Sequence, residues 1–191
     1  IPFKAGLGGG SSNAAAVILA INEQLHLKAS KEKLKEIGMR LGADVPFFID
    51  CKPSRVTGVG DKIEPIKIKD HYEVLIVKPE RGLSTKEVYA ICDDFEKGNI
   101  NNDEVITGLL TGNDEKIANN YGNDLLPAGE KLAPEISVYL DELRAFGFPI
   151  VSMSGSGSCV FAMSKNGKAI KEAYKKLLRK GYNVYQSKII R

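Results

Sequence analysis

The stretch IPFKAGLGGGSSNAAAVILAI runs from Ile1 to Ile21 and contains four glycines within five positions, followed by two serines, an asparagine and an apolar run. Glycine lacks a Cβ and lets the backbone approach a ligand closely, and Ser and Asn are favoured at helix starts. We therefore predict a helix from about Ser11. A glycine-rich loop before a buried helix presents free N–H groups and a positive dipole end, which suit a phosphate. The alternative is a tight turn that only introduces a core helix.

The composition is that of an ordinary soluble globular protein, with 43% hydrophobic and 27% charged residues and a formal charge of +3. This charge is too small to indicate a nucleic-acid partner, and no apolar run is long enough to cross a membrane. Three widely spaced cysteines favour reduced thiols in a cytoplasmic protein. Two histidines without ligand spacing argue against a metal cluster and a Ser/His/Asp triad.

The chain opens at Ile1, directly before its richest loop and without a Met. Because a phosphate loop usually follows a strand, we expect the sequence to be a fragment of a longer protein that lacks its N-terminal part.

Local signals continue along the first third of the chain. Ser30 is a predicted cap for a second helix that ends at Gly42, with an apolar side formed by Leu34, Ile37, Met39 and Leu41. Pro46 disfavours helical geometry at the preceding residue, so Asp44 is expected in a helix-to-strand connection. Residues 55–58 and 62–66 are predicted to form a hairpin. A polar segment at 67–71 suggests two domains, 1–68 and 69–191.

The second domain is predicted to contain strands at 72–78, 150–153, 159–163 and 183–190. Its predicted helices are at 84–95, within 130–146 and at about 168–180. Short helical pieces are expected between residues 96 and 126. The apolar face of the 130–146 helix would use Ile136, Val138, Leu140 and Leu143, with Pro134 near its first turn. Without the middle helices the order is β-α-β-β-α-β, which is a ferredoxin-like, two-layer α+β arrangement.

A second glycine loop lies between two of these strands and consists of Ser154, Gly155, Ser156, Gly157 and Ser158. By itself it could be a hairpin turn. Together with the first loop it suggests a phosphate chain held from two sides. The P-loop pattern GxxxxGK[ST] does not occur, and Gly6-x-Gly8 is followed by Ser11 where a Rossmann motif needs glycine.

The two loops resemble those of the GHMP kinases, the group that contains galactokinase, homoserine kinase, mevalonate kinase and phosphomevalonate kinase. Within this group, GLGGGSSNAAA at 6–16 together with LGADVPFF at 41–48 resembles the 4-diphosphocytidyl-2-C-methyl-D-erythritol kinase family. Gly-Val-Gly-Asp at 58–61 and Gly-Asn-Asp-Leu at 122–125 are also similar to that family. The resemblance extends over essentially the whole chain. It implies a GHMP kinase fold, with the C-terminal portion of the N-terminal kinase domain followed by a ferredoxin-like C-terminal domain.

The resemblance implies transfer of a phosphoryl group from ATP, with Mg²⁺, to the 2-hydroxyl of a cytidine-diphosphate sugar alcohol in non-mevalonate isoprenoid synthesis. Asp44 matches the catalytic aspartate that accepts the hydroxyl proton; by its position alone it could form an Asx turn. Tyr89 matches a position that packs on the cytosine ring, although it could equally be a core residue. Gly82, Ser84 and Thr85 would lie near the sugar alcohol. The residues that match the ATP loop are Pro2, Phe3, Lys4, Ala5, Gly6, Leu7, Gly8, Gly9, Gly10, Ser11 and Ser12.

Two alternatives stay open at this point: another kinase of the group, such as one for homoserine, and a nucleotide-binding fragment without catalysis. The family's first motif, which carries a lysine that pairs with the catalytic Asp, would precede Ile1. We therefore expect residues 1–191 alone to be inactive. The sequence indicates neither the Mg²⁺ ligands nor the oligomeric state.

Overall fold

A computed structural model of the chain describes residues 1–190 and divides into two compact units. The smaller unit contains Gly8–Lys67 and Ile190, and the larger unit contains Ile1–Leu7 and Ile68–Ile189. The division falls between Leu7 and Gly8, so the first glycine loop contributes residues to both units. In the described part of the chain, no helix has the length and apolar character needed to cross a membrane.

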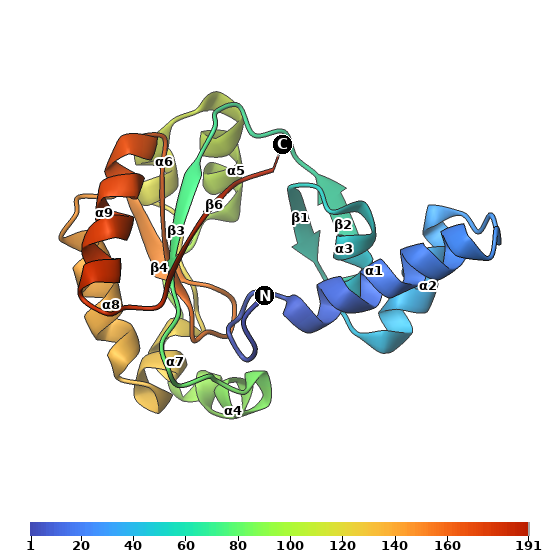
Figure 1. The fold of residues 1–191 in the computed structure, drawn as a ribbon, viewed down its shortest axis with the longest axis horizontal. Coiled ribbons are helices and arrows are strands. Elements are labelled where there is room, and N and C mark those ends of the chain that lie inside the picture. The colour runs from blue at the N-terminus through green and yellow to red at the C-terminus, as the bar shows by residue number, and fades with distance from the viewer. Residues whose placement is uncertain (191) are drawn as a thin grey trace. The chain divides into compact units, whose positions relative to one another are not determined.

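The smaller unit is a group of three helices with a two-stranded hairpin (Figure 1). As predicted, the Ser30 side chain accepts a hydrogen bond from the Lys33 amide at the start of the second helix, and Gly42 follows its end. The predicted hairpin is also confirmed, with Val56 opposite Ile63. The elements are α1 Gly9–Gln24, α2 Lys31–Leu41, α3 Val45–Asp50, β1 Ser54–Thr57 and β2 Lys62–Pro65.

The prediction that Asp44 leads into a strand is wrong, because Val45–Asp50 is the helix α3 and Asp44 is its N-cap residue. Pro46 lies in the first turn of α3, where its missing N–H breaks no helical hydrogen bond. Val45 and Ile49 are buried against Ala15 and Leu34, and this helix-to-helix contact decides the conformation of the segment.

The first helix was expected to be buried, and in the described chain this expectation is wrong. Only Ala15 of α1 is buried, whereas Val17 and Ile21 are 57% and 48% exposed. On α2, Leu34 is buried as predicted, but Ile37 and Leu41 are exposed.

The larger unit is built on a four-stranded antiparallel sheet in the order β4-β5-β3-β6. This order, with the crossover helices, confirms the predicted ferredoxin-like α+β fold. Its strands are β3 Glu73–Val77, β4 Ile150–Met153, β5 Val160–Ser164 and β6 Val184–Lys188. Its helices are α4 Thr85–Ile91, the short 3₁₀ helix η1 Cys92–Asp94, α5 Asn102–Thr111, α6 Asp114–Ala118, α7 Leu126–Leu132, α8 Glu135–Arg144 and α9 Gly167–Arg179.

Alternate residues of β3 point to opposite faces of the sheet, as the period of a strand requires. Leu75 and Val77 belong to the main core with residues of α7, α8 and α9, while Val74 packs on the other face with Ile117 of α6. Figure 1 shows α8 and α9 on one side of the sheet and α5 and α6 on the other. The expected two layers therefore carry an additional helical pair over the second face.

The helix predicted within 130–146 is confirmed as α8, and the separate helix α7 precedes it and ends at Leu132. Pro134 is the N-cap residue of α8, directly before the first turn, as predicted. Ile136, Leu140 and Leu143 are fully buried as predicted, but Val138 is 55% exposed because it lies on the opposite side of α8.

Candidate active site

The second half of the first glycine loop forms the start of α1. Gly8 is the N-cap residue in the left-handed region, with φ +62°, and no side chain caps the helix in the described chain. The Ser12 amide and hydroxyl bond back to the carbonyls of Gly8 and Gly9, at 2.9 and 3.0 Å. A Cβ placed on Gly10 would meet no described atom within 4 Å. The first amides of a 16-residue helix are thus accessible to an anion.

The first half of the same loop is held by its backbone within the larger unit. The carbonyls of Lys4 and Ala5 accept hydrogen bonds from the amides of Leu83 and Cys159, at 3.1 and 3.2 Å. The Gly6 carbonyl accepts one from the Ser154 hydroxyl at 2.9 Å. Residues 4–6 therefore join the loop at 82–85 to the second glycine loop.

The second glycine loop is fixed mainly by its own serines. The hydroxyls of Ser154 and Ser156 bond to the Gly6 carbonyl and to the Thr85 hydroxyl, the latter at 2.9 Å, and Ser158 is fully buried. Gly155 is the exposed residue of the loop. A ligand could consequently reach this loop around Gly155. The Ser158 side chain lies on the buried side of the loop, away from solvent.

Asn123 is a functional candidate that sequence reasoning missed. Its side-chain amide donates to the carbonyls of Met153 and Gly155, at 2.9 and 2.8 Å, and so fixes the start of the second glycine loop. The only signal for this residue was its place in the Gly-Asn-Asp-Leu string at 122–125, which gives no indication of the contact.

The two predicted substrate residues share one side of α4. Thr85 is its first residue and bonds to Ser156, and Tyr89 follows one turn later. Tyr89 is 59% exposed, so the interpretation of Tyr89 as a core residue is wrong, and Val88 fills the core position instead. An exposed ring, one helical turn from a residue bonded to the second glycine loop, is suited to stacking on a planar base.

Asp44 lies in the smaller unit with Gly8–Ser12. Its side chain is exposed and makes no cap hydrogen bond to α3, although an N-cap Asp usually makes one. Asp44 also precedes Phe48 by four residues, and Phe48 packs so closely on Gly8 that a Cβ there would come within 2.6 Å of its ring. The carboxylate is therefore on the side of α3 that contacts the glycine turn.

The backbone around Asp44 is well supported. The Val45 amide bonds to the Gly42 carbonyl at 3.1 Å, and the Val45 side chain is buried. The tip of the β1–β2 hairpin packs on the preceding residue, since a Cβ on Gly60 would lie 2.6 Å from the Ala43 carbonyl oxygen. A free carboxylate on a fixed backbone is the arrangement that proton abstraction requires.

Cys159 follows the second glycine loop but is unsuited to nucleophilic chemistry. It is fully buried, and burial raises the pKa of its thiol to about 11. The thiol is therefore protonated at neutral pH.

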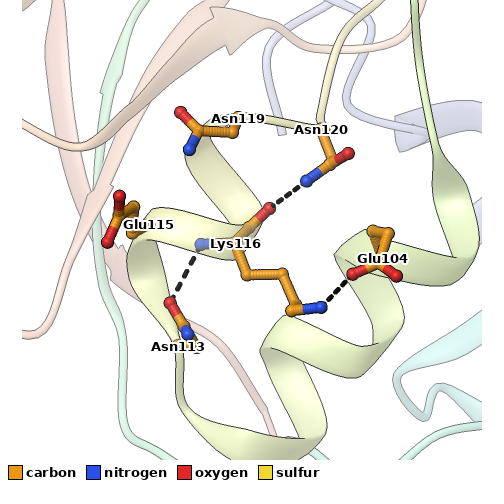
Figure 2. A pocket seen from close by; sticks show the side chains of 6 residues that line it. All are labelled: Glu104, Asn113, Glu115, Lys116, Asn119 and Asn120. Carbon is orange, nitrogen blue, oxygen red and sulfur yellow. Dashed lines mark hydrogen bonds and ion pairs between the residues drawn. The ribbon is translucent and has the colours of Figure 1, made fainter.

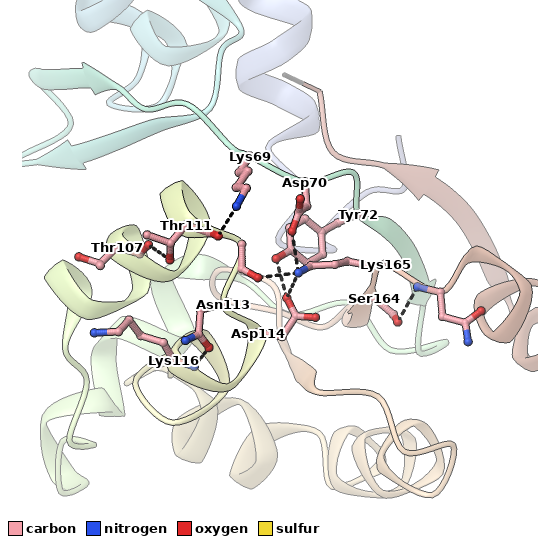
Figure 3. Close-up of polar contacts among 12 residues, drawn as sticks. Lys69, Asp70, Tyr72, Thr107, Thr111, Asn113, Asp114, Lys116, Ser164 and Lys165 are labelled. Carbon is pink, nitrogen blue, oxygen red and sulfur yellow. Dashed lines mark hydrogen bonds and ion pairs between the residues drawn. The ribbon is translucent and has the colours of Figure 1, made fainter.

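Two further polar clusters lie on α5 and α6, away from the glycine loops in the sequence. The first lines a hollow of about 330 Å³ in which Lys116 pairs with Glu104 (Figure 2). In the second, Lys165 contacts the carboxylates of Asp70 and Asp114, at 2.7 and 3.0 Å, and the Tyr72 hydroxyl donates to Asp114 at 2.7 Å (Figure 3). Burial and this hydrogen bond raise the pKa of Tyr72. The first cluster connects α5 to α6, and the second connects α6 to residues that flank strands of the sheet. Among the described residues, neither cluster contains a group that points to a ligand.

Comparison with known proteins shows the family of this chain. The family model described as GHMP kinases N terminal domain matches residues 1–52, and GHMP kinases C terminal matches residues 105–183. A 4-diphosphocytidyl-2-C-methyl-D-erythritol kinase from Clostridium beijerinckii is 35% identical over 201 residues, which cover all of this chain and 68% of that protein. This chain belongs to the GHMP kinase family. The resemblance predicted from the two glycine loops and the LGADVPFF string is thereby confirmed.

Within the GHMP kinases, this chain groups with the 4-diphosphocytidyl-2-C-methyl-D-erythritol kinases. The relative of that name from Carboxydothermus hydrogenoformans is 37% identical over 95% of this chain. The chain spans 64% of the length of that relative. A crystal structure of 4-(cytidine 5'-diphospho)-2C-methyl-D-erythritol kinase superposes with a TM-score of 0.79 at 29% identity, over 98% of this GHMP kinase chain and 67% of that one.

Proposed function

We propose that the full-length protein transfers the γ-phosphoryl group of ATP to the 2-hydroxyl of 4-diphosphocytidyl-2-C-methyl-D-erythritol, a step of non-mevalonate isoprenoid synthesis. The proposal is supported by the relatives of that name and by the similar crystal structure. The observation that carries it is the exposed Asp44 carboxylate, which caps no helix and lies on the side of α3 that contacts the glycine turn. The cytoplasmic location expected from the free cysteines is part of the same proposal.

ATP would bind with its phosphates at the start of α1. The amides of Gly9, Gly10 and Ser11 are in the first turn, and the helix dipole adds positive potential there. This arrangement stabilises the charge that is distributed over the phosphate oxygens during transfer.

Asp44 would orient the acceptor hydroxyl and accept its proton as the oxygen attacks the γ-phosphorus. A carboxylate does so only within hydrogen-bond reach of the hydroxyl. Because the Asp44 carboxylate has no cap hydrogen bond to break, no fold contact is lost when it turns to the substrate.

Mg²⁺ is part of the proposal as the usual companion of ATP. The described residues contain no cluster of three or more His, Cys, Asp or Glu side chains that could hold a metal ion. This composition fits the way Mg²⁺ binds in many kinases, where substrate phosphates and waters supply most ligands and the protein adds one or two oxygens. The Ser11 hydroxyl, beside the first amides of α1, is the side chain we assign to this contact.

The cytidine part of the acceptor would bind in the larger unit. Tyr89 offers an exposed ring, and the Thr85–Ser156 hydrogen bond fixes the adjacent turn of α4 on the second glycine loop. Aromatic rings stack on bases of any sequence, with energies of about 1–3 kcal/mol per base.

The test is Asp44→Asn in the full-length protein, assayed by ADP release at saturating ATP and acceptor. Asn keeps the shape of Asp but cannot take the proton, so we expect kcat to fall by ~10²–10⁴-fold with an unchanged melting temperature. Asp50→Asn is the matched control, because Asp50 is on the same helix but binds Lys31 and Lys35. It should lower the melting temperature slightly and leave kcat unchanged.

Three results would contradict the proposal. The first is an unchanged kcat of Asp44→Asn with an unchanged melting temperature. The second is an equal loss of kcat in Asp44→Asn and Asp50→Asn. The third is phosphorylation of homoserine in preference to the cytidine-diphosphate acceptor by the wild-type protein.

A further inference from the structure

Lys78 is a buried lysine that no step above uses. It follows β3, and its side chain is only 8% exposed. By contrast, Lys165 and Lys180 each face carboxylates, at 2.6–3.0 Å. Within residues 1–190, Lys78 has no such carboxylate partner. A buried cation without a counter-charge is costly, so its retention requires a compensating interaction.

The ammonium is surrounded by three neutral oxygens. It donates to the Pro79 carbonyl and, at 3.4 Å, to the Arg81 carbonyl and to the Ser158 hydroxyl. Carbonyl oxygens only accept, and three acceptors match the three donors of a charged ammonium. All three contacts are to uncharged groups, so none of them supplies a counter-charge to the lysine.

The three contacts also determine where this charge lies. Pro79 and Arg81 begin the loop that reaches Thr85, and Ser158 ends the second glycine loop. Asn123 fixes the opposite end of that glycine loop through Met153 and Gly155. The Lys78 charge consequently lies at the base of the glycine loop, on its buried side.

We propose that Lys78 is a positioning residue whose buried charge completes an anion site at the second glycine loop, where a polyphosphate group of a substrate binds. The inference rests on the proposed function, which supplies two polyphosphates: the triphosphate of ATP and the diphosphate of the cytidylated acceptor. The ligand phosphate is then the missing counter-charge. In a site of low dielectric constant, such a charge acts without direct contact.

The decisive variant is Lys78→Gln in the full-length protein. Gln can still donate to the carbonyls of Pro79 and Arg81 but has no charge. We expect the dissociation constants of CDP and ATP, measured separately by calorimetry, to show about a tenfold loss for the nucleotide whose phosphates face this loop. The melting temperature without ligand should stay the same or rise, because an uncompensated buried charge has been removed.

Lys165→Met is the matched control from the same unit. Lys165 pairs with two carboxylates, so this variant should melt earlier while both dissociation constants stay unchanged. Lys78→Met, which lacks both the donors and the charge, separates the two contributions. A hydrogen-bonding role predicts weak binding in the Met variant only, whereas a charge role predicts weak binding in both.

Unchanged affinity of Lys78→Gln for both nucleotides would overturn the inference, whether or not its melting temperature is lower. Should Lys78→Met not fold, the Gln variant still decides. Failure of the proposed function is a separate result, because wild-type protein would then not bind CDP, whatever its affinity for ATP.

Discussion

Substitution of Gly6 by alanine tests the connection between the two glycine loops most directly. Gly6 has φ +70°, and a Cβ at this position would lie 1.9 Å from the Ser154 carbonyl oxygen and 2.8 Å from the Gly157 nitrogen. Both of these are backbone atoms, so no rotamer change can relieve the overlap. Either residues 4–7 or residues 154–157 must move.

The expected cost follows from these contacts. An alanine in the left-handed region costs roughly 1–2 kcal/mol. Moving either segment weakens the Ser154–Gly6 and Cys159–Ala5 hydrogen bonds, each with a net contribution of about 1 kcal/mol. The free energy of unfolding should therefore fall by about 3–4 kcal/mol, a large part of the ~5–15 kcal/mol that stabilises an ordinary domain.

Two measurements check this expectation on full-length protein. Urea unfolding gives the free energy, and hydrogen exchange at the Leu83 and Cys159 amides reports whether residues 4 and 5 have detached, since both amides donate to them. Gly10→Ala is the control: its Cβ would meet nothing described within 4 Å, so stability should be unchanged or slightly higher. Unchanged unfolding and exchange in Gly6→Ala would refute the reasoning.

The remaining predictions concern two different faces of the larger unit. Tyr89→Leu removes only an exposed stacking ring, so the melting temperature should stay unchanged. The KM for the cytidine-diphosphate acceptor should rise by about 5- to 100-fold while the KM for ATP stays constant. Equal changes in both KM values would exclude a cytosine contact. Lys165→Met should lower stability by about 1–3 kcal/mol at neutral pH, because two partly exposed carboxylates, Asp70 and Asp114, lose their shared cation. The deficit should persist through neutral pH and shrink only in strong alkali, where Lys165 loses its charge. Burial lowers the pKa of Lys165, but the hydrogen bonds with Asp70 and Asp114 outweigh burial and raise it above 10.5. A pH-independent deficit in urea unfolding would contradict the account.

Signals that act over a few residues were sufficient for much of the fold. Ser30 predicts the start of its helix because an N-cap hydrogen bond spans only three positions. The strand at 72–78 is predicted by its continuous apolar residues, because β3 is covered on both faces. The glycines at 6–10 predict a loop and a following helix for the same reason. The family followed from the joint presence of two such strings, which requires no knowledge of their placement in space.

Where local signals conflict, tertiary contacts decided the outcome. Pro46 is compatible with a strand that follows it and with the first turn of a helix, and only the packing of Val45 and Ile49 on α1 and α2 selects the helix. The same holds for Val138, which fits the apolar face by spacing but lies on the exposed side of α8.

The candidate site depended most on long-range structure. The sequence indicated two glycine loops, but the hydrogen bond between Ser154 and Gly6 joins positions 148 residues apart, and no local pattern encodes it. The burial of Lys78 could not be predicted either, because a lysine at the end of a strand is usually exposed to solvent. Which residues a sequence offers for chemistry is therefore a local property, whereas which of them meet, and in what dielectric, is decided by the packing of distant segments.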